Sequence, residues 1–98
     1  MREAALEAGC RQDAAAVGFD FPKLSTGRVG RPDRLLPLPD APAVYVELKT
    51  PRGRISKPQE REHVRLRSLG YRVEVIRTRL AFRYLLCEYS VDARSRWM

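Results

Sequence analysis

AVYVELK, residues 43–49, is the stretch that decides the fold, because its side chains alternate with the period of a β-strand. The two valines and the leucine point to one face, which is suited to a core. Glu47 and Lys49 point to the opposite face. The stretch therefore predicts a strand that presents an acidic and a basic side chain together on one side of a sheet.

Downstream of this strand, the sequence predicts a turn, a helix, a further strand and a closing helix. Ser56-Lys57-Pro58-Gln59 has the form of a capping box with proline in the first turn, so a helix is expected to begin there. Gly70 is a natural residue to end it. Residues 71–76 alternate as a strand and residues 80–88 form a helical pattern, whereas the tail 90–98 is expected to be loosely ordered.

Upstream, the segment 2–17 is rich in alanine and predicts a first helix. A short extended piece at 19–24 and a flexible basic loop at 25–32 follow it. A second extended piece spans 34–38, and its Pro37 cannot donate a hydrogen bond, which marks a sheet edge or an early end of that strand. The resulting order, α-β-β-β-α-β-α, predicts an α/β fold with a small mixed β-sheet flanked by helices.

The length and charge of the chain indicate its assembly and its partner. Its 98 residues suffice for one domain, which we expect to span 1–98. A chain of this size has a thin core, so a homodimer is expected to bury further surface.

The formal net charge is +7, and only three basic residues are lysine. An arginine surplus favours a phosphate-rich partner such as DNA, although solubility alone is the simpler explanation.

The cysteines and the histidine argue against two kinds of site. Cys10 and Cys87 lie far apart without a CxxC partner, and His63 is the one histidine, so neither a zinc site nor a disulfide scaffold is expected. The N-terminus lacks an apolar targeting segment, and no apolar run approaches the roughly 20 residues that span a bilayer. We therefore expect packed, reduced thiols in a cytoplasmic protein with no membrane partner.

Two acids and a lysine are placed where two strands can pair. Asp33 heads the extended piece at 34–38, and Glu47 lies on the polar face of the next strand. In a hairpin both carboxylates would reach one divalent cation beside an exposed groove, and magnesium is typically held by one or two carboxylates. Lys49 would orient a nucleophile or offset charge on a phosphate. The simpler alternatives are a surface pair of Glu47 and Lys49, and a turn position for Asp33.

Four motifs then follow one another in a fixed order. They are G-R-P-D-R at 30–34, V-E-L-K at 46–49, G-R-I-S-K-P-Q at 53–59 and L-G-Y at 69–71. A bare E-x-K occurs by chance in many proteins, whereas this order and spacing is far more specific. The motifs resemble those of the VRR-NUC domains within the PD-(D/E)xK nuclease superfamily, in the stand-alone phage or bacterial form. The resemblance runs from about Glu3 to about Leu86.

This resemblance implies a restriction-endonuclease-like core and a set of site residues. Asp33, Glu47 and the backbone carbonyl of Leu48 would hold Mg²⁺ or Mn²⁺, and Lys49 would be the catalytic lysine. Gln59 would be the helix-borne glutamine that faces the site, although its capping-box role is also a sufficient explanation. No small-molecule organic cofactor is implied.

The resemblance also assigns residues around the site. Glu3 would be the acid that closes the pocket from the first helix, although Glu7 lies one turn on and a plain helix N-terminal acid is the alternative. His63 is expected to pack or to contact DNA rather than to act as a general base. Basic side chains of the loops would grip the nucleic-acid backbone, with ordinary solvated loop charge as the alternative. These are Lys23, Arg28, Arg31, Arg52 and Arg54.

The function implied is that of a metal-dependent, structure-selective endonuclease that hydrolyses phosphodiester bonds of branched DNA. Small members of the family resemble Holliday-junction resolvases and are expected to act as homodimers, in a bacterial or phage-infected cell. The first alternative is a non-catalytic nucleic-acid-binding module that retains the nuclease fold. The intact pair of acids argues against it, because a module that only binds DNA has no reason to place two carboxylates against a polyanion without a cation between them. The second alternative is an accessory protein-interaction subunit of a phage or bacterial replication system.

Overall fold

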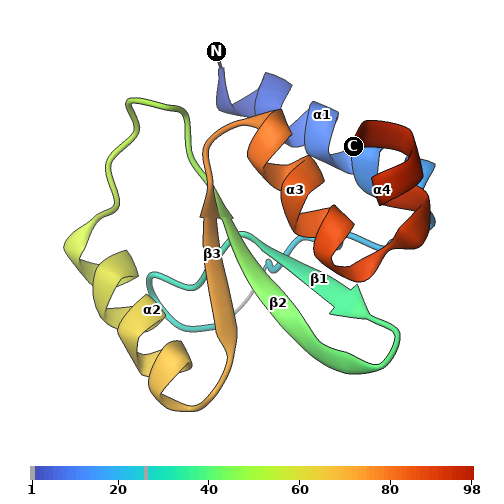
Figure 1. Ribbon diagram of the computed structural model, residues 1–98. Helices are drawn as coiled ribbons and strands as arrows, with labels where there is room; N and C mark the ends of the chain where they lie inside the picture. The colour runs from blue at the N-terminus through green and yellow to red at the C-terminus, as the bar shows by residue number, and fades with distance from the viewer. Residues whose placement is uncertain (1, 26) are drawn as a thin grey trace.

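The strand predicted from the alternation in residues 43–49 is present as β2 (Ala41–Leu48), and it is the central strand of a three-stranded sheet. The computed structural model describes residues 2–25 and 27–98 (Figure 1). The other elements are α1 (Glu3–Ala16), β1 (Arg34–Leu38), α2 (Lys57–Ser68), β3 (Arg72–Ile76), α3 (Arg79–Tyr89) and α4 (Val91–Trp97).

The sheet is mixed, with the strand order β1-β2-β3. β1 and β2 form an antiparallel hairpin, whereas β2 and β3 are parallel and are connected by α2. A crossover helix is the usual connection between parallel strands. The register of the hairpin shifts between Leu36 and Leu38, on either side of Pro37, because proline cannot donate to the ladder. β1 thus continues past Pro37 at the cost of an irregularity at the sheet edge.

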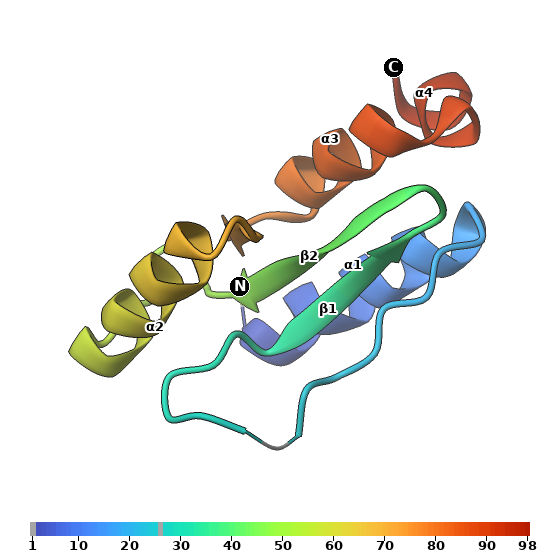
Figure 2. The same cartoon turned by 90° about the horizontal axis from the view of Figure 1, so that it is seen from below.

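The helices lie on two sides of the sheet. α1, α3 and α4 gather on one side, and α2 lies alone on the other (Figures 1 and 2). The apolar face of β2 packs into the core with α1 and α3, which contribute Leu6, Cys10, Phe82 and Leu86. The opposite face of β2 carries Glu47 and faces α2. The alternation in β2 therefore separates a packed face from a polar one.

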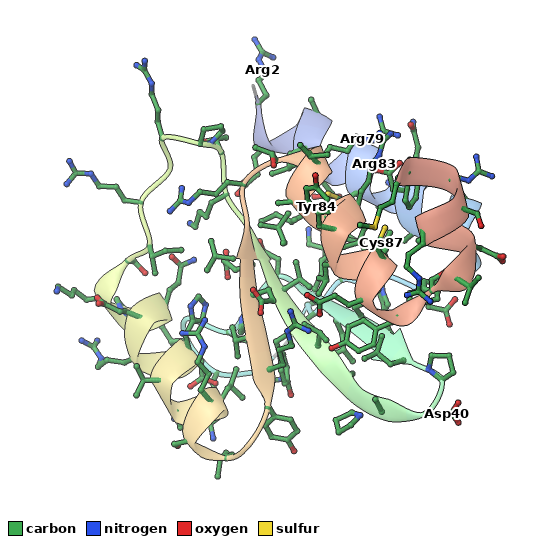
Figure 3. All side chains as sticks on the ribbon, in the orientation of Figure 1. Arg2, Asp40, Arg79, Arg83, Tyr84 and Cys87 are labelled. Carbon is green, nitrogen blue, oxygen red and sulfur yellow. The ribbon has the colours of Figure 1, made fainter. Side chains whose placement is uncertain are left out.

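An arginine clamp joins α1 to α3 on the packed side. Asp13 of α1 accepts hydrogen bonds from Arg79 Nε at 2.8 Å and from Arg83 Nε at 2.9 Å. Figure 3 shows Arg79 and Arg83 on the part of α3 that lies beside α1. The guanidinium of Arg83 also lies 5.0 Å from the ring centre of Trp97 in α4. The clamp thus joins α1 to α3 and α4, two consecutive helices that come much later in the sequence.

The α/β class with a mixed sheet is confirmed, and two details of the prediction are wrong. The extended piece at 19–24 is not a full strand, since Lys23 makes an isolated bridge to Arg34. Pro22 lacks an amide hydrogen, which limits the pairing available to this piece. The tail 90–98 is not loosely ordered, because Ser90 caps α4 and Ala93 is fully buried in the core. The observed order is therefore α-β-β-α-β-α-α.

Two other expectations concern thiols and membranes. Cys10 and Cys87 are both free and buried, as predicted. Burial is the main cause that raises the pKa of Cys10 to about 12, so this thiol stays protonated at neutral pH. Within residues 2–25 and 27–98, no helix is long and apolar enough to cross a bilayer.

Candidate active site

Asp33 and Glu47 come together where β1 and β2 pair. Arg34 is opposite Val46 in the antiparallel ladder, so one step along the register places Asp33 opposite Glu47. Residues directly opposite one another in such a pair point to the same face. Asp33 Oδ2 also accepts a hydrogen bond from the backbone amide of Leu48 at 3.0 Å. This bond fixes the Asp33 carboxylate beside the end of β2.

Glu47 is buried, and its surroundings disfavour the ionised form of its carboxyl group. Its exposed fraction is 1%. Burial is the main cause that raises its pKa from 4.5 to about 8, and the charge and hydrogen bonding of Asp33 raise it further. The positive charge of Lys49, on the same face of the strand, opposes this shift. At neutral pH the pair therefore retains a proton unless a further positive charge is brought to it.

One oxygen of Glu47 lacks a partner among the described residues. Oε1 is buried without a hydrogen bond, and so is Nε2 of His63. The two atoms lie 3.9 Å apart, which is too long for a hydrogen bond. Burial lowers the pKa of His63, so this ring is neutral at neutral pH and does not supply the missing charge. His63 is packed, as expected, and it borders the site.

Gln59 of α2 uses both ends of its side-chain amide. Its Oε1 accepts from the backbone amide of Ser56 at 2.9 Å, and its own backbone amide donates to Ser56 Oγ at 3.2 Å, which completes the predicted capping box. Its Nε2 donates to Glu47 Oε2 at 3.3 Å. From the sequence, helix capping and a place in the active site are alternative explanations for Gln59. In the structure Gln59 makes both contacts at once.

The two acids of the first helix differ in their surroundings. Glu7 Oε1 accepts a hydrogen bond from Arg34 Nη2 at 2.6 Å, so its charge is balanced within the fold. Glu3 is exposed, and its negative charge adds to the raised pKa of Glu47. The structure therefore brings Glu3, and not Glu7, into electrostatic contact with the carboxylate pair.

The five basic side chains predicted to bind nucleic acid have different surroundings. Three are exposed outside the helices and strands, namely Lys23, Arg52 and Arg54. Arg28 is 58% exposed, but its Nε donates to the buried carboxylate of Glu62 at 3.0 Å. Arg31 is partly buried, and its guanidinium lies against Gly27, where a side chain would overlap it. Arg28 is therefore held more firmly than its place in a loop suggests.

The chemistry of these donors fits a hard divalent cation. No group of three or more His, Cys, Asp or Glu side chains in the described part of the chain is arranged to hold a metal. Two carboxylates that repel each other, one with an unpartnered buried oxygen, are nevertheless enough for magnesium, which keeps several waters. The expectation of an exposed groove is wrong for Glu47, because Gln59 and His63 lie against it. Both neighbours are polar, so an ion is not excluded by apolar packing.

Comparison with known proteins decides the family. Residues 1–80 match the family described as the VRR-NUC domain. The chain belongs to this family. A solved structure described as "VRR_NUC domain" superimposes with a TM-score of 0.77 at 31% sequence identity, covering 89% of this chain and 96% of that one.

A curated relative comes from a phage. "Putative nuclease p44" of Acyrthosiphon pisum secondary endosymbiont phage 1 is 42% identical over 59 residues, which is 60% of this chain. The match spans 63% of the length of that relative. The similarity therefore includes much of the VRR-NUC domain but not the whole of the phage protein.

Sequence reasoning missed one residue that positions the site of this VRR-NUC domain. Arg34, directly after Asp33, is buried, and its Nη1 donates to the backbone oxygen of Phe21 at 2.6 Å. Together with its bond to Glu7, this contact fixes the start of β1 against α1. The available signal was a charged residue at the beginning of an otherwise apolar strand.

Proposed function

We propose that this VRR-NUC domain is a metal-dependent endodeoxyribonuclease that hydrolyses phosphodiester bonds of DNA. The carboxylate pair of Asp33 and Glu47 carries the proposal. Burial and mutual repulsion raise the pKa of Glu47 to about 8, and its Oε1 has no partner within the described chain. A divalent cation would relieve both conditions, because it would stabilise the ionised carboxylates and ligate the free oxygen.

Each site residue has a role that follows from its position. Asp33, Glu47 and the backbone carbonyl of Leu48 would hold Mg²⁺ or Mn²⁺. Such an ion, when bound, supplies positive charge against the phosphate and makes a water more acidic. Lys49, two residues after Glu47 on the same face, would orient the attacking water and stabilise negative charge that develops on the phosphate.

Two side chains would support this centre. Gln59 would keep the Glu47 carboxylate in one orientation through the bond from its Nε2. Glu3 would close the site from α1, where its charge acts on Glu47. Neither side chain needs to touch the substrate in this arrangement. Their effect on the reaction would come from positioning the carboxylates and setting their charge.

The substrate that we propose is branched DNA, cleaved by a homodimer in the cytoplasm of a bacterial or phage-infected cell. The net charge of +7 and the exposed loop side chains Lys23, Arg52 and Arg54 support a polyanionic partner. Residues 1–98 would act as one domain, so a single copy carries one site. Two copies would supply two sites, as cleavage of two strands at a junction requires.

The test is a cleavage assay of the purified protein on labelled four-way junction, flap and linear duplex DNA, in Mg²⁺, Mn²⁺ or EDTA. Lys49→Ala is compared with Lys57→Ala, a matched control whose side chain is 84% exposed on α2. We expect metal-dependent cleavage that Lys49→Ala loses and Lys57→Ala retains. Activity that survives both EDTA and Lys49→Ala would contradict the mechanism. Binding without cleavage would instead identify a non-catalytic module.

A further inference from the structure

A cavity of about 370 Å³ lies between α2 and the loop that precedes Asp33. Its lining residues are Arg28, Val29, Pro58, Arg61, Glu62 and Arg65. Three guanidinium groups and one carboxylate leave a formal charge of +2 on this small surface. A concave surface with such a surplus attracts an anion.

Glu62 organises the arginines of this cavity. It is buried, and its Oε1 accepts from Arg28 Nε at 3.0 Å. Arg65 Nε and Nη2 donate to the same carboxylate at 2.9 and 2.8 Å. Hydrogen bonds from Arg65 and Arg28 lower the pKa of Glu62 to about 2, so the carboxylate stays ionised at neutral pH. The two arginines are thus ordered before any ligand binds.

The bonds to Glu62 leave donors available for a ligand. Arg28 uses only its Nε, and its two terminal nitrogens have no acceptor among the described residues. Arg61 is exposed and makes no hydrogen bond or ion pair within the same part of the chain. A guanidinium with its terminal nitrogens free binds phosphate oxygens as a fork, with good geometry and strength.

Gly30 fixes the loop that carries Arg28 against α2. Its φ is +81°, and a Cβ at this position would overlap the backbone carbonyl of Pro58. A glycine is therefore required for this close approach. The contact sets the position of Arg28 opposite Arg61, although the two residues are far apart in the sequence.

We propose that Arg28, Arg61 and Arg65 form a subsite for a backbone phosphate of bound DNA, and that Glu62 orients Arg28 and Arg65 for it. This inference rests on the proposed function and extends it. Glu62 directly precedes His63, which borders Glu47, so the subsite and the active site occupy adjacent faces of α2. A helix with side chains is roughly 10–12 Å wide, and a DNA strand rises about 3.4 Å per nucleotide. The subsite therefore holds a phosphate a few nucleotides from the one that is cleaved.

The test measures binding without cleavage. The anisotropy of a fluorescein-labelled four-way junction is followed in EDTA at several salt concentrations, for the full chain and its variants. Arg61→Ala is expected to weaken binding roughly 3- to 10-fold and to reduce the slope of log affinity against log salt by about 1. Arg96→Ala, an exposed arginine of α4 on the other side of the sheet, is the matched control and should change neither quantity. Equal behaviour of the two variants would overturn the subsite.

A second pair of variants distinguishes the effect of orienting the arginines from the effect of changing the net charge of α2. Glu62→Gln and Glu60→Gln remove the same charge from the same helix, but Glu60 is exposed, and its ion pair among the described side chains is with Lys57. General electrostatics predicts tighter binding for both. The subsite predicts that Glu62→Gln binds more weakly than Glu60→Gln, because a neutral amide with one acceptor oxygen replaces the carboxylate that orders Arg28 and Arg65. Equal tightening in both variants would refute the role of Glu62.

The two proposals can fail separately. A wild-type protein that does not cleave DNA in Mg²⁺ or Mn²⁺ refutes the proposed nuclease but leaves the binding comparison intact. A wild-type protein that cleaves, with Arg61→Ala and Arg96→Ala binding alike, refutes the subsite alone. Circular dichroism of each variant checks that it is folded, and Arg61→Ala, at an exposed position, provides the test if Glu62→Gln is unstable.

Discussion

Two buried carboxylates, Asp13 on one side of the sheet and Glu47 on the other, have opposite electrostatic surroundings. Asp13 is 2% exposed and is bound by Arg79 and Arg83. Burial acts to raise its pKa, but the hydrogen bonds and charges of the two arginines outweigh burial and lower the pKa. Glu47 is equally buried, but no arginine among the described residues donates a hydrogen bond to it, and its pKa is raised to about 8.

This difference separates a structural acid from a site acid. The charge of Asp13 is neutralised by the chain itself, and the result is a contact that joins α1 to α3. The charge of Glu47 is compensated only in part, by Lys49, and lies next to a second carboxylate, which is costly for a folded protein unless something else supplies the missing charge. We infer that Asp13 serves the fold and that Glu47 serves an ion.

The largest effect is expected for Glu47→Gln in the cleavage assay. Replacing this carboxylate should lower the rate by at least roughly 10³-fold, because a neutral amide is a much weaker ligand for a divalent cation. The fold should remain, since a neutral amide relieves the repulsion from Asp33. If a folded Glu47→Gln protein cleaves DNA within a few-fold of the wild-type rate, Glu47 does not serve an ion, and it no longer differs from Asp13 in function.

The complementary variant is Asp13→Asn, which should act on stability. We expect it to lower the free energy of unfolding by about 2–3 kcal/mol, because Arg79 and Arg83 lose a charged acceptor that is buried. Urea unfolding measures this, with Asp92→Asn at an exposed position of α4 as the control. Cleavage per folded molecule should stay near that of wild type. A loss of cleavage without a loss of stability would contradict the assignment.

The two acids should also give opposite dependences of stability on pH. The folded pKa of Glu47 lies above its ordinary value of 4.5, so its favourable contribution is complete below about pH 4.5 and is lost as the pH rises through 8. Asp13 has a lowered pKa, so its contribution is present above its ordinary value of 3.8 and is lost as the pH falls.

Urea unfolding in EDTA at pH 5 and pH 9 tests this contrast. The metal-free wild type should lose about 1–3 kcal/mol between these values, and Glu47→Gln should lose much less. Equal losses in the two proteins would show that Glu47 is not the group responsible. Adding Mg²⁺ in excess of the EDTA at pH 9 should restore stability to wild type only, because a bound cation stabilises the ionised carboxylate.

A smaller effect separates the two contacts of Gln59. Gln59→Ala removes the acceptor of the Ser56 amide and the bond to Glu47, whereas Ser56→Ala removes only the acceptor of the Gln59 backbone amide. Each should cost about 0.5–2 kcal/mol of stability. Only Gln59→Ala should also lower the cleavage rate, by roughly 10-fold, as expected for a group that orients an ion ligand. Equal cleavage by the two variants would limit Gln59 to capping.

Local patterns made much of the fold predictable from sequence. The alternation of residues 43–49 gave the central strand, and the spacing of Ser56 and Gln59 gave the start of α2. These features depend on neighbours within a few residues. The short helix α4 was missed because seven residues carry little periodicity, and the burial of Ala93 in the core depends on tertiary packing.

The candidate site was predictable to a different degree. The register of β1 and β2 follows from the hairpin, so the meeting of Asp33 and Glu47 could be expected. The burial of Glu47 could not, because it depends on how α2 packs across the sheet. The pairing of Glu7 with Arg34, which leaves Glu3 as the acid that acts on Glu47, likewise depends on contacts between distant segments.

Calorimetric titration of Mn²⁺ into the metal-free protein measures whether Glu47 is a ligand of a divalent cation. Wild type and Asp13→Asn are compared with Glu47→Gln under the same conditions. We predict that wild type and folded Asp13→Asn bind one ion per chain, and that Glu47→Gln does not bind it. If wild type fails to bind Mn²⁺ at millimolar concentration, or if Glu47→Gln binds it as wild type does, Glu47 is not an ion ligand.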